Sequence, residues 1–482
     1  MKDAIKSVSV KKNYVLNLLL NLLNLIFPLI TFPYVSRVLG TTGIGKVDFA
    51  TSVVQYFIFA GSLGIPLYGV REIARARNSK QETDKVFSEL FIIGIISNLL
   101  STVALLITIL SVKKFNSEGL LFYLTSVNML LNVFAIDWLF QGFEDYKYIT
   151  IRSIIIKVIS IFFIYMFIKQ KNDYILYSVV SIIGISGSNI LNILSARKYV
   201  KLQFRNLNLK KHLKPLFYIF SSQIAASIYL NLTTTMLGFM AAASAVGIYS
   251  AANKINKVVI AVVTALGLVL TPRLSTYFKN KQMDEIHLLL KQSIQFVLLI
   301  SIPFIFALIA ISDRLVPLFL GAKFGGAVMT MRILSPVILL VGISNVTNTQ
   351  ILIPMGKERY IAKSVVIAAV ANFIANLCLI PIFKENGAAI ATMVAELAVT
   401  IIQMYYSRNI IKNLIFNKEN LNYPIASIAM TVVILIVKFF VHSALISLGL
   451  AFILGCSVYF LVLFLLKDKI LNIIMKYLLR RA

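Results

Sequence analysis

Basic side chains inside long apolar segments are the residues of this sequence with the clearest chemistry. Lys254 and Lys257 lie about two to three turns inside the apolar segment 245–271, and Arg332 lies inside segment 326–354. A basic residue at the centre of a membrane helix costs a few kcal/mol, so it normally faces a partner or a water-filled cavity. A phosphate or diphosphate in such a cavity needs cations and amide donors. The excess of cations in these segments therefore predicts an anionic substrate.

Two further cations, Arg152 and Lys157, lie in segment 148–168. They could face the same cavity as Lys254. The alternative, which carries equal weight for this pair, is a salt bridge within the membrane or a side chain that reaches the surface.

Acidic residues are fewer in these segments, and two of them could balance the cations. Glu396 lies in segment 387–407 and Asp48 in segment 44–69. A carboxylate at such a position could pair with a cation or carry a coupling proton or sodium ion. Lys46 lies two residues before Asp48, so these two side chains could instead form a local ion pair.

Amide and hydroxyl side chains form a stripe on each of two apolar segments. At 3.6 residues per turn, positions spaced by three or four residues share one face of a helix. Such residues commonly hydrogen-bond to neighbouring membrane helices, but two matching stripes favour a wet cavity. The first stripe is Asn13, Asn17, Asn21 and Asn24, and the second is Gln223, Ser227, Asn231 and Thr234.

About fourteen apolar segments must position these residues, and each is near the length that crosses a bilayer. A hydrocarbon core about 30 Å thick needs about 20 apolar residues per helix. Of the 482 residues, 59% are apolar and 14% are charged, whereas about 25% are charged in a soluble protein. The sequence therefore predicts an all-α integral membrane protein. Its spans are 13–35, 44–69, 87–111, 119–141, 148–168, 174–196, 215–240, 245–271, 289–311, 326–354, 361–382, 387–407, 423–442 and 444–466.

The net charge of +28 is a topology signal rather than a sign of nucleic-acid binding. The basic residues form short clusters, and none of the connecting segments is long enough to fold into a basic domain. Placing the N-terminus in the cytoplasm puts most of them on the inner side, as the positive-inside rule requires. With an even number of spans, both termini are cytoplasmic. The clearest inner clusters are Arg71, Arg75, Arg77, Lys80 and Lys85, and Arg197, Lys198, Lys201, Arg205, Lys210, Lys211 and Lys214.

Other kinds of chemistry have little support in the sequence. Cys378 and Cys456 both fall inside predicted spans, so we expect no disulfide. The three histidines, at 212, 287 and 442, are too far apart for a metal site, and there is no Gly-rich Walker loop. We therefore expect no metal, no cofactor and no catalytic residues, and the chain is not predicted to be an enzyme.

An internal repeat divides the segments into groups. TGIGKVDFATS at 42–52 is similar to SAVGIYSAANK at 244–254, and each stretch begins the second helix of a six-helix block. Six is an even number, so both blocks would start on the same membrane face, as in transporters built from parallel repeats. The predicted lobes are 1–205 and 206–415, followed by two additional helices and a cytoplasmic tail at 416–482.

Proline and glycine mark where helices could bend beside a cavity. Pro28 and Pro33 are expected to end the first helix. Gly64 with Pro66, and Pro336 with Gly342, are expected to interrupt the second and tenth helices. These bends could act as hinges or be static kinks.

Seven stretches together resemble one family, the bacterial polysaccharide repeat-unit flippases of the multidrug/oligosaccharidyl-lipid/polysaccharide exporter superfamily. They cover nearly the whole chain in the order typical of that family. The stretches are PLITFPYVSRVLG (28–40), SLGIPLYGVREIARAR (62–77), IDWLFQGFEDYKYITIRSIIIK (136–157), VGIYSAANKI (246–255), PLFLGAKFGGAV (317–328), LIPMGKERY (352–360) and NGAAIATMVAEL (386–397).

The resemblance implies two lobes that open alternately to the two faces of the bacterial cytoplasmic membrane. The substrate would be an oligosaccharide on undecaprenyl diphosphate, and the partners would be membrane lipids and the polymerase and glycosyltransferases of the same pathway. Related lipid II flippases carry a basic residue after a Y-x-A-x-x pattern, which Tyr249, Ala251 and Lys254 match. Arg37 and Arg71 match family positions near the ends of spans, where anchoring or gating is as good an explanation as substrate contact.

Two other functions compete with this interpretation. A multidrug antiporter of the same superfamily would favour acidic residues in its cavity, which the excess of basic residues opposes. A multispan polysaccharide polymerase or glycosyltransferase usually needs a large outer loop with catalytic groups. The longest predicted outer loop here, 312–325, is short and largely apolar.

Overall fold

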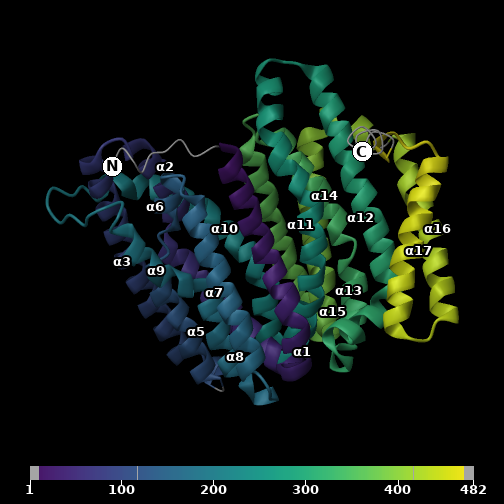
Figure 1. Cartoon of the computed structure of the whole chain (residues 1–482), viewed down its shortest axis with the longest axis horizontal. Coiled ribbons are helices and arrows are strands. Elements are labelled where there is room, and N and C mark those ends of the chain that lie inside the picture. Colours follow the sequence, from purple (N-terminus) through teal and green to yellow (C-terminus); the bar gives the residue numbers. More distant parts are fainter. Residues whose placement is uncertain (1–9, 117, 416, 472–482) are drawn as a thin grey trace. The chain divides into compact units, whose positions relative to one another are not determined.

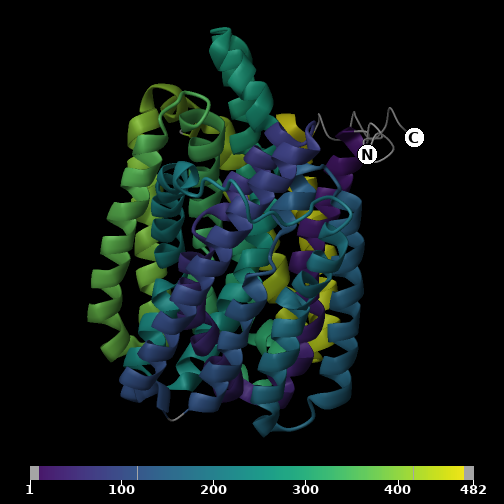
Figure 2. The same cartoon turned by 90° about the vertical axis from the view of Figure 1, so that its left-hand side faces the viewer.

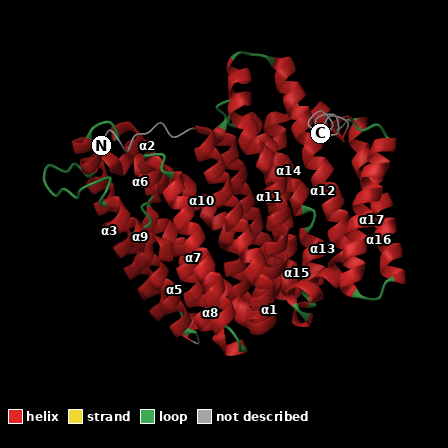
Figure 3. Ribbon diagram, in the orientation of Figure 1, coloured by secondary structure: helices red, strands yellow, loops and turns green. Residues whose placement is uncertain are grey.

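In the computed structural model, helices account for all regular secondary structure of residues 10–116, 118–415 and 417–471, which are the residues that the structure describes (Figure 3). No β-strand occurs within those ranges. Eleven helical segments there are long and apolar enough to cross a membrane. The predicted fold class, an all-α integral membrane protein, is therefore confirmed.

Two of the eleven segments are bent, and each contains two of the predicted apolar runs. Helix α1 (Val10–Ser62) leaves helical geometry at Gly40, where φ is 68°, and α15 (Glu358–Ile415) does so at Lys384, where φ is 50°. The two halves of α15 contact each other, because Asn372 Nδ2 donates to the carbonyl of Ala391 at 3.1 Å. The total of fourteen spans stays a prediction.

The chain divides into two compact units, with the division between Phe239 and Met240 (Figure 1). Unit 1 contains α1, α2 (Ile65–Ala76), α3 (Lys80–Ser111), α4 (Lys113–Asn116), α5 (Gly119–Asn132), α6 (Asp137–Gly142), α7 (Tyr146–Phe167), α8 (Tyr174–Ile182), α9 (Ser188–Ala196) and nearly all of α10 (Lys210–Met240). Unit 2 contains α11 (Ala243–Lys279), α12 (Met283–Leu320), α13 (Ala327–Leu334), α14 (Val337–Asn345), α15, α16 (Asn422–Phe440) and α17 (Ala444–Leu465).

Helix α10 packs in unit 1 at its carboxyl-terminal end. The ring of Phe239 meets the ring of Phe49 edge-on, with centroids 5.3 Å apart. Gly238 lies so close to the same ring that an added Cβ would be 2.0 Å from Phe49 Cδ2. The internal repeat instead groups α10 with the second lobe, and the lobe boundaries 1–205 and 206–415 stay a prediction.

The core of unit 1 forms where α2, α3 and α6 meet. Trp138 of α6 covers Gly69 of α2, where an added Cβ would be 2.6 Å from Trp138 Cε3. Phe87 of α3 packs against the same indole, with ring centroids 5.6 Å apart. Gly69 therefore permits a close approach of the two short helices, which carry two of the sequence stretches named above. In Figure 2 the blue helices of unit 1 face the viewer.

Helix α1 continues through Pro28 and Pro33, so the prediction that these prolines end the first helix is wrong. Membrane helices tolerate proline where side-chain hydroxyls or neighbouring groups satisfy the carbonyls that it disturbs. The break comes later, at Gly40.

Large apolar side chains remain exposed on several helices. In water such surfaces would cause association, whereas they are the normal surface of a helix in contact with lipid. This exposure agrees with the membrane assignment. Examples are Leu100 (68%), Leu110 (68%), Phe162 (61%), Phe439 (77%) and Phe452 (70%).

Candidate functional site

Lys254 and Lys257 lie on one side of α11, and the packed face of that helix lies on another. Tyr249, Ala252 and Asn256 are buried, at spacings of three and four residues. The hydroxyl of Tyr249 hydrogen-bonds with Thr392 Oγ1 of α15 at 2.9 Å, which fixes the rotation of α11 about its axis. Lys254 is half-buried and Lys257 is exposed. Both lysines thus lie on a different side of α11 from Ala252 and Asn256.

Arg332 of α13 bonds to α12. Its Nε donates to the carbonyl of Ile309 at 3.1 Å and to Ser312 Oγ at 2.9 Å. The next residue of α12, Asp313, pairs with Lys438 of α16 at 2.8 Å. These contacts connect α12 to α13 and α16, and they give Arg332 a role in helix packing. Its contact with substrate stays a prediction.

The acidic candidates lie on separate helices. Glu396 is half-buried on α15 and Asp48 is half-buried on α1. Lys46, which could form an ion pair with Asp48, pairs with Glu118 at 2.5 Å and lies 4.6 Å from the centroid of the Tyr174 ring. Lys46 therefore connects α1 to the segment before α5 and to α8.

The predicted stripe on α1 is only partly within the described side chains. Asn13 is buried, and its Oδ1 has no hydrogen-bond partner among the described residues. Asn17 is exposed, and the side chain of Asn21 is outside the description. Asn24 accepts a hydrogen bond from Lys157 of α7. The structure thus places Lys157 and Asn24 together.

The second stripe, on α10, shows a different kind of bond. Asn231 Nδ2 donates to the carbonyl of Ser227 in its own helix at 3.1 Å. The side chain of Gln223 lies outside the described residues. A cavity lined by the two stripes stays a prediction.

The two arginines near span ends have different surroundings. Arg71 of α2 bonds through Nε to Glu72 at 3.1 Å and lies 5.0 Å from the centroid of the Tyr68 ring. About half of its side chain is exposed. Arg37 is exposed on α1. The proposed substrate contacts of Arg37 and Arg71 stay a prediction.

Arg152 belongs to a buried polar cluster, in agreement with the alternative of a salt bridge within the membrane. Its Nη2 donates to Asp137 Oδ1 at 2.9 Å, and its Nη1 donates to Asn192 Oδ1. Asn192 Nδ2 donates to the same carboxylate at 2.8 Å. Arg152 is only 4% exposed. This network joins α6, α7 and α9 and accounts for the arginine structurally.

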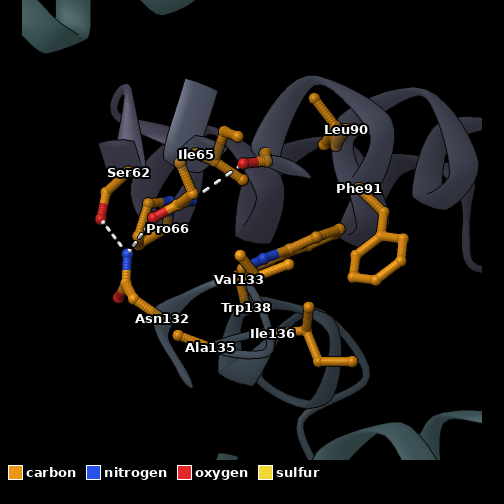
Figure 4. Close-up of a pocket in the computed structure, with 12 residues that line it drawn as sticks. Ser62, Ile65, Pro66, Leu90, Phe91, Asn132, Val133, Ala135, Ile136 and Trp138 are labelled. Carbon is orange, nitrogen blue, oxygen red and sulfur yellow. Dashed lines mark hydrogen bonds between the residues drawn. The ribbon is translucent and has the colours of Figure 1, made fainter. Parts of the chain in front are cut away.

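A pocket that sequence reasoning missed lies in unit 1 (Figure 4). Asn132 Nδ2 donates to Ser62 Oγ at 3.1 Å and to Asn98 Oδ1 at 2.9 Å, which gives the pocket a polar floor. Apolar side chains, among them Phe91 and Trp138, form the rest of its wall. Its volume of about 30 Å³ is enough for about two water molecules. In the sequence, the available signal for this pocket was the presence of isolated amide side chains in predicted spans.

A second network, also missed, holds the segment that connects α9 to α10. We call residues 197–209 the strap. Three side chains of α3 accept hydrogen bonds from its backbone: Asp84 from Lys201, Ser88 from Gln203 and Glu89 from Asn208, at 2.8, 2.8 and 2.7 Å. The amino group of Lys80 donates to the carbonyl of Tyr199 at 2.7 Å. The strap is therefore fixed along the first turns of α3.

In the first turn of α10, directly after the strap, a histidine lies between an acid and a phenol. His212 Nε2 lies 2.9 Å from Glu89 Oε2, and His212 Nδ1 lies 2.9 Å from the hydroxyl of Tyr68. Lys211 pairs with the same carboxylate at 2.7 Å. The side chain of Glu89 has no exposed surface. The start of α10 is thus joined to α2 and α3 by a buried, fully bonded acid.

At the other end of the strap, the phenol of Tyr199 donates to Asp145 Oδ2 at 2.7 Å. Burial of the ring, and next the hydrogen bond to this carboxylate, raise the pKa of Tyr199 well above its usual value. The phenol therefore stays protonated and keeps donating at any pH at which the membrane protein is studied.

Comparison with known proteins gives two family matches. The model of a family described as polysaccharide biosynthesis protein matches residues 10–278, which is more than half of the chain. A second model, MatE, matches residues 219–378.

Two curated relatives match most of the chain, and both are named, provisionally, as O-antigen transporters. The relative from Escherichia coli strain K12 is 25% identical over 408 residues, which are 83% of this chain and 97% of the relative. The relative from Shigella dysenteriae is 26% identical over 366 residues, which are 74% of this chain and 90% of the relative.

Two solved structures share the fold. The lipid II flippase MurJ in an inward closed conformation has a TM-score of 0.76 at 15% identity, over 93% of this chain and 98% of that one. An inward-facing multidrug resistance transporter of the MATE family has a TM-score of 0.66 at 15% identity, over 80% and 94%. The helical arrangement is therefore that of known membrane transporters.

Proposed function

Because this chain belongs to the polysaccharide biosynthesis protein family, we propose that it is a flippase for lipid-linked oligosaccharides. It moves repeat units on undecaprenyl diphosphate from the inner to the outer leaflet of the cytoplasmic membrane, for capsule, O-antigen or another surface polysaccharide. The observation that carries this proposal is the match to two O-antigen transporters along nearly their whole lengths. The fold shared with a lipid II flippase supports the same type of reaction, in which no covalent bond changes.

The main energetic cost of this transport comes from moving the charged diphosphate across the membrane. Its charges lose hydration in a medium of low dielectric constant, so the path must supply cations and hydrogen-bond donors. Lys254 is our first candidate, because it lies across α11 from the buried Ala252 and Asn256 and because it completes the Y-x-A-x-x pattern. Its alternating exposure to the two membrane faces would carry the headgroup across. The further proposed contacts are Lys257, Arg332, Arg37 and Arg71 for the diphosphate, and Asn17, Asn21, Asn24, Gln223 and Asn231 for the sugars.

Substitution of Lys254 by alanine tests this assignment. A hydrogen bond to a charged group contributes about 1.5–3 kcal/mol, so K254A should slow flipping about 10- to 150-fold in vesicles that contain the purified protein and a lipid-linked oligosaccharide. K254R should restore part of the rate because it keeps the charge. Lys279, exposed in the last turn of the same helix, provides the matched control, and K279A should flip at the wild-type rate. Equal rates for K254A and wild type would remove Lys254 from the mechanism.

Depletion of the protein in its own bacterium tests the function itself. Without the flippase, the lipid-linked repeat unit should accumulate on the cytoplasmic leaflet, and the surface polysaccharide should be lost. If no such intermediate accumulates, the flippase proposal fails, whatever the result for Lys254.

Glu396 and Asp48 are proposed as residues that couple transport to an ion gradient. Each carboxylate lies half-buried in a helix. At such a position, protonation or a bound sodium ion can neutralise the carboxylate without a large further loss of hydration. In vesicles, E396Q or D48N should flip at a rate that no longer depends on the gradient. A gradient dependence that is unchanged in both variants would exclude this role.

Export of cationic drugs is the second candidate function, favoured by the MatE match and by the fold shared with a MATE transporter. It predicts that expression of the chain in a drug-sensitive host raises resistance to cationic dyes. We expect no such resistance, because the spans contain more basic than acidic residues.

The chain is a multi-pass membrane transporter. We propose that it lies in the bacterial cytoplasmic membrane with both termini in the cytoplasm, and that the polymerase and glycosyltransferases of its pathway are its partners. Cysteines introduced near residues 5 and 478 should react with a membrane-impermeant thiol reagent only after the cells are opened.

A further inference from the structure

A second cleft in unit 1, distinct from the pocket of Figure 4, lies between α3, α9 and the strap. Its volume is about 410 Å³, within the range of about 300–1,000 Å³ of typical small-ligand sites. Its apolar lining consists of Phe87 and Phe91 of α3, Ile136, Ile193 and Ala196 of the α6 and α9 region, and Val200 and Leu202 of the strap. Arg197 and Lys201 provide the only charged side chains of this lining.

The two cations of the cleft have no acidic partner among the residues that the structure describes. Both side chains are exposed. Three acidic side chains at this end of unit 1 pair with other cations: Asp84 with Lys80, Glu89 with Lys211, and Glu144 with Arg77. A fourth, Asp145, accepts a hydrogen bond from the phenol of Tyr199. An apolar cleft with two unneutralised cations is complementary to an amphiphile with an anionic headgroup.

The strap itself resembles a segment at a membrane surface. Leu202 is 48% exposed and Phe204 is 77% exposed, although both lie among basic residues. Exposed apolar side chains beside Lys and Arg are typical of segments that lie at the level of the lipid headgroups. The cleft would then open toward the lipids of the adjacent leaflet.

We propose that the cleft binds an anionic glycerophospholipid, with one acyl chain along Phe87 and Phe91 and the phosphate between Arg197 and Lys201. No amide or carboxylate side chain lines the cleft, so it offers no groups that would bind the sugars of the transported repeat unit. The site is therefore one for a resident lipid. This proposal requires the membrane location of the chain but does not depend on flippase activity.

The bound lipid would stabilise the connection to α10. The backbone of Lys201 is already held by Asp84 of α3, and the lipid phosphate would hold the side chain of the same residue. Anionic lipid should thus protect the strap from proteolysis at Lys201 and Arg205.

The chain contains a built-in reporter for this cleft. Trp138 is the single tryptophan, and its indole packs against Phe87, which lines the cleft. Bromine atoms on an acyl chain quench tryptophan fluorescence at short range. The full-length protein is therefore placed in phosphatidylcholine vesicles. These contain roughly 20 mol % of either brominated phosphatidylglycerol or brominated phosphatidylcholine. Stronger quenching by the brominated phosphatidylglycerol is the expected result.

Two double variants, each of which removes two positive charges, distinguish binding in the cleft from general electrostatic attraction to anionic lipid. R197Q/K201Q removes both cations of the cleft, and its affinity for the anionic lipid should fall about 30-fold, at about 1 kcal/mol per cation. K198Q/R205Q removes two exposed cations of the strap that do not line the cleft, and it should keep the preference for phosphatidylglycerol within about twofold. Emission without brominated lipid verifies that both variants retain the packing of Trp138.

Three results would overturn the proposal. The two brominated lipids could quench wild-type Trp138 equally, or both double variants could lose the preference to the same extent. Unbrominated undecaprenyl diphosphate could also relieve the quenching at lower concentration than phosphatidylglycerol does, which would make the cleft a substrate site. None of these results would contradict the flippase function, which the depletion experiment tests separately.

Discussion

Removal of the buried carboxylate of Glu89 should be one of the most destabilising single changes in unit 1. The carboxylate bonds with the backbone of Asn208, with His212 and with Lys211, at 2.7, 2.9 and 2.7 Å. Removing one partner of a buried charged pair typically costs about 3–5 kcal/mol, because the remaining groups stay buried without partners. We therefore expect E89A to destabilise unit 1 by about 3 kcal/mol or more. At about 2–4 °C per kcal/mol for a domain of this size, the apparent Tm should fall by about 6–12 °C.

Thermal melting of the purified protein in detergent, followed by Trp138 fluorescence, measures this effect. Limited trypsin digestion adds a local readout, because the strap should be cleaved faster than in the wild type once Glu89 no longer holds its end. Glu72 offers a matched control, since it also pairs with two basic residues, Arg71 and Arg75, but at the surface. E72A should cost at most about 1 kcal/mol. If E89A melts at the same temperature as E72A and its strap resists trypsin, the reasoning about a buried acid is refuted.

Two further predictions concern the packing of unit 1. R152A leaves Asp137 without its cation, which should lower the free energy of unfolding by about 3–5 kcal/mol. The yield of folded protein after size-exclusion chromatography should drop accordingly. A wild-type yield and Tm would contradict the buried ion pair. G69V places a side chain where even a Cβ would be 2.6 Å from Trp138, so it should cost about 1–3 kcal/mol and shift the Trp138 emission to longer wavelength. G94A, whose Cβ would be 3.4 Å from its nearest neighbour, should leave that emission unchanged, and a similar shift in both variants would show that the contact is not specific.

The sequence was sufficient to predict the membrane class and several of the helix breaks. Helix α2 begins directly after Gly64, where φ is 76°, and the predicted break at Pro336 separates α13 from α14. These features depend on local chemistry, because glycine permits positive φ and proline lacks a donor. Pro28 and Pro33 did not end their helix, since a membrane helix can accommodate proline when its surroundings satisfy the backbone.

The two buried polar networks could not be predicted, because they depend on contacts between residues that are far apart in the sequence. Glu89 and His212 are 123 positions apart, and Arg152 and Asn192 are 40 apart. Composition indicates that a buried charge needs a partner, but only packing decides which partner it meets. Arg152 shows this limit, because its type and position suited a cavity and a structural ion pair equally well.

The bend of α15 has a consequence for how this membrane protein is made. Its two halves are joined through Lys384 without an intervening loop, and Gly387 packs so closely that an added Cβ would be 2.3 Å from the carbonyl oxygen of Leu379. Because no loop separates them in the folded protein, we expect the two halves to enter the bilayer as a pair, in the form of a helical hairpin.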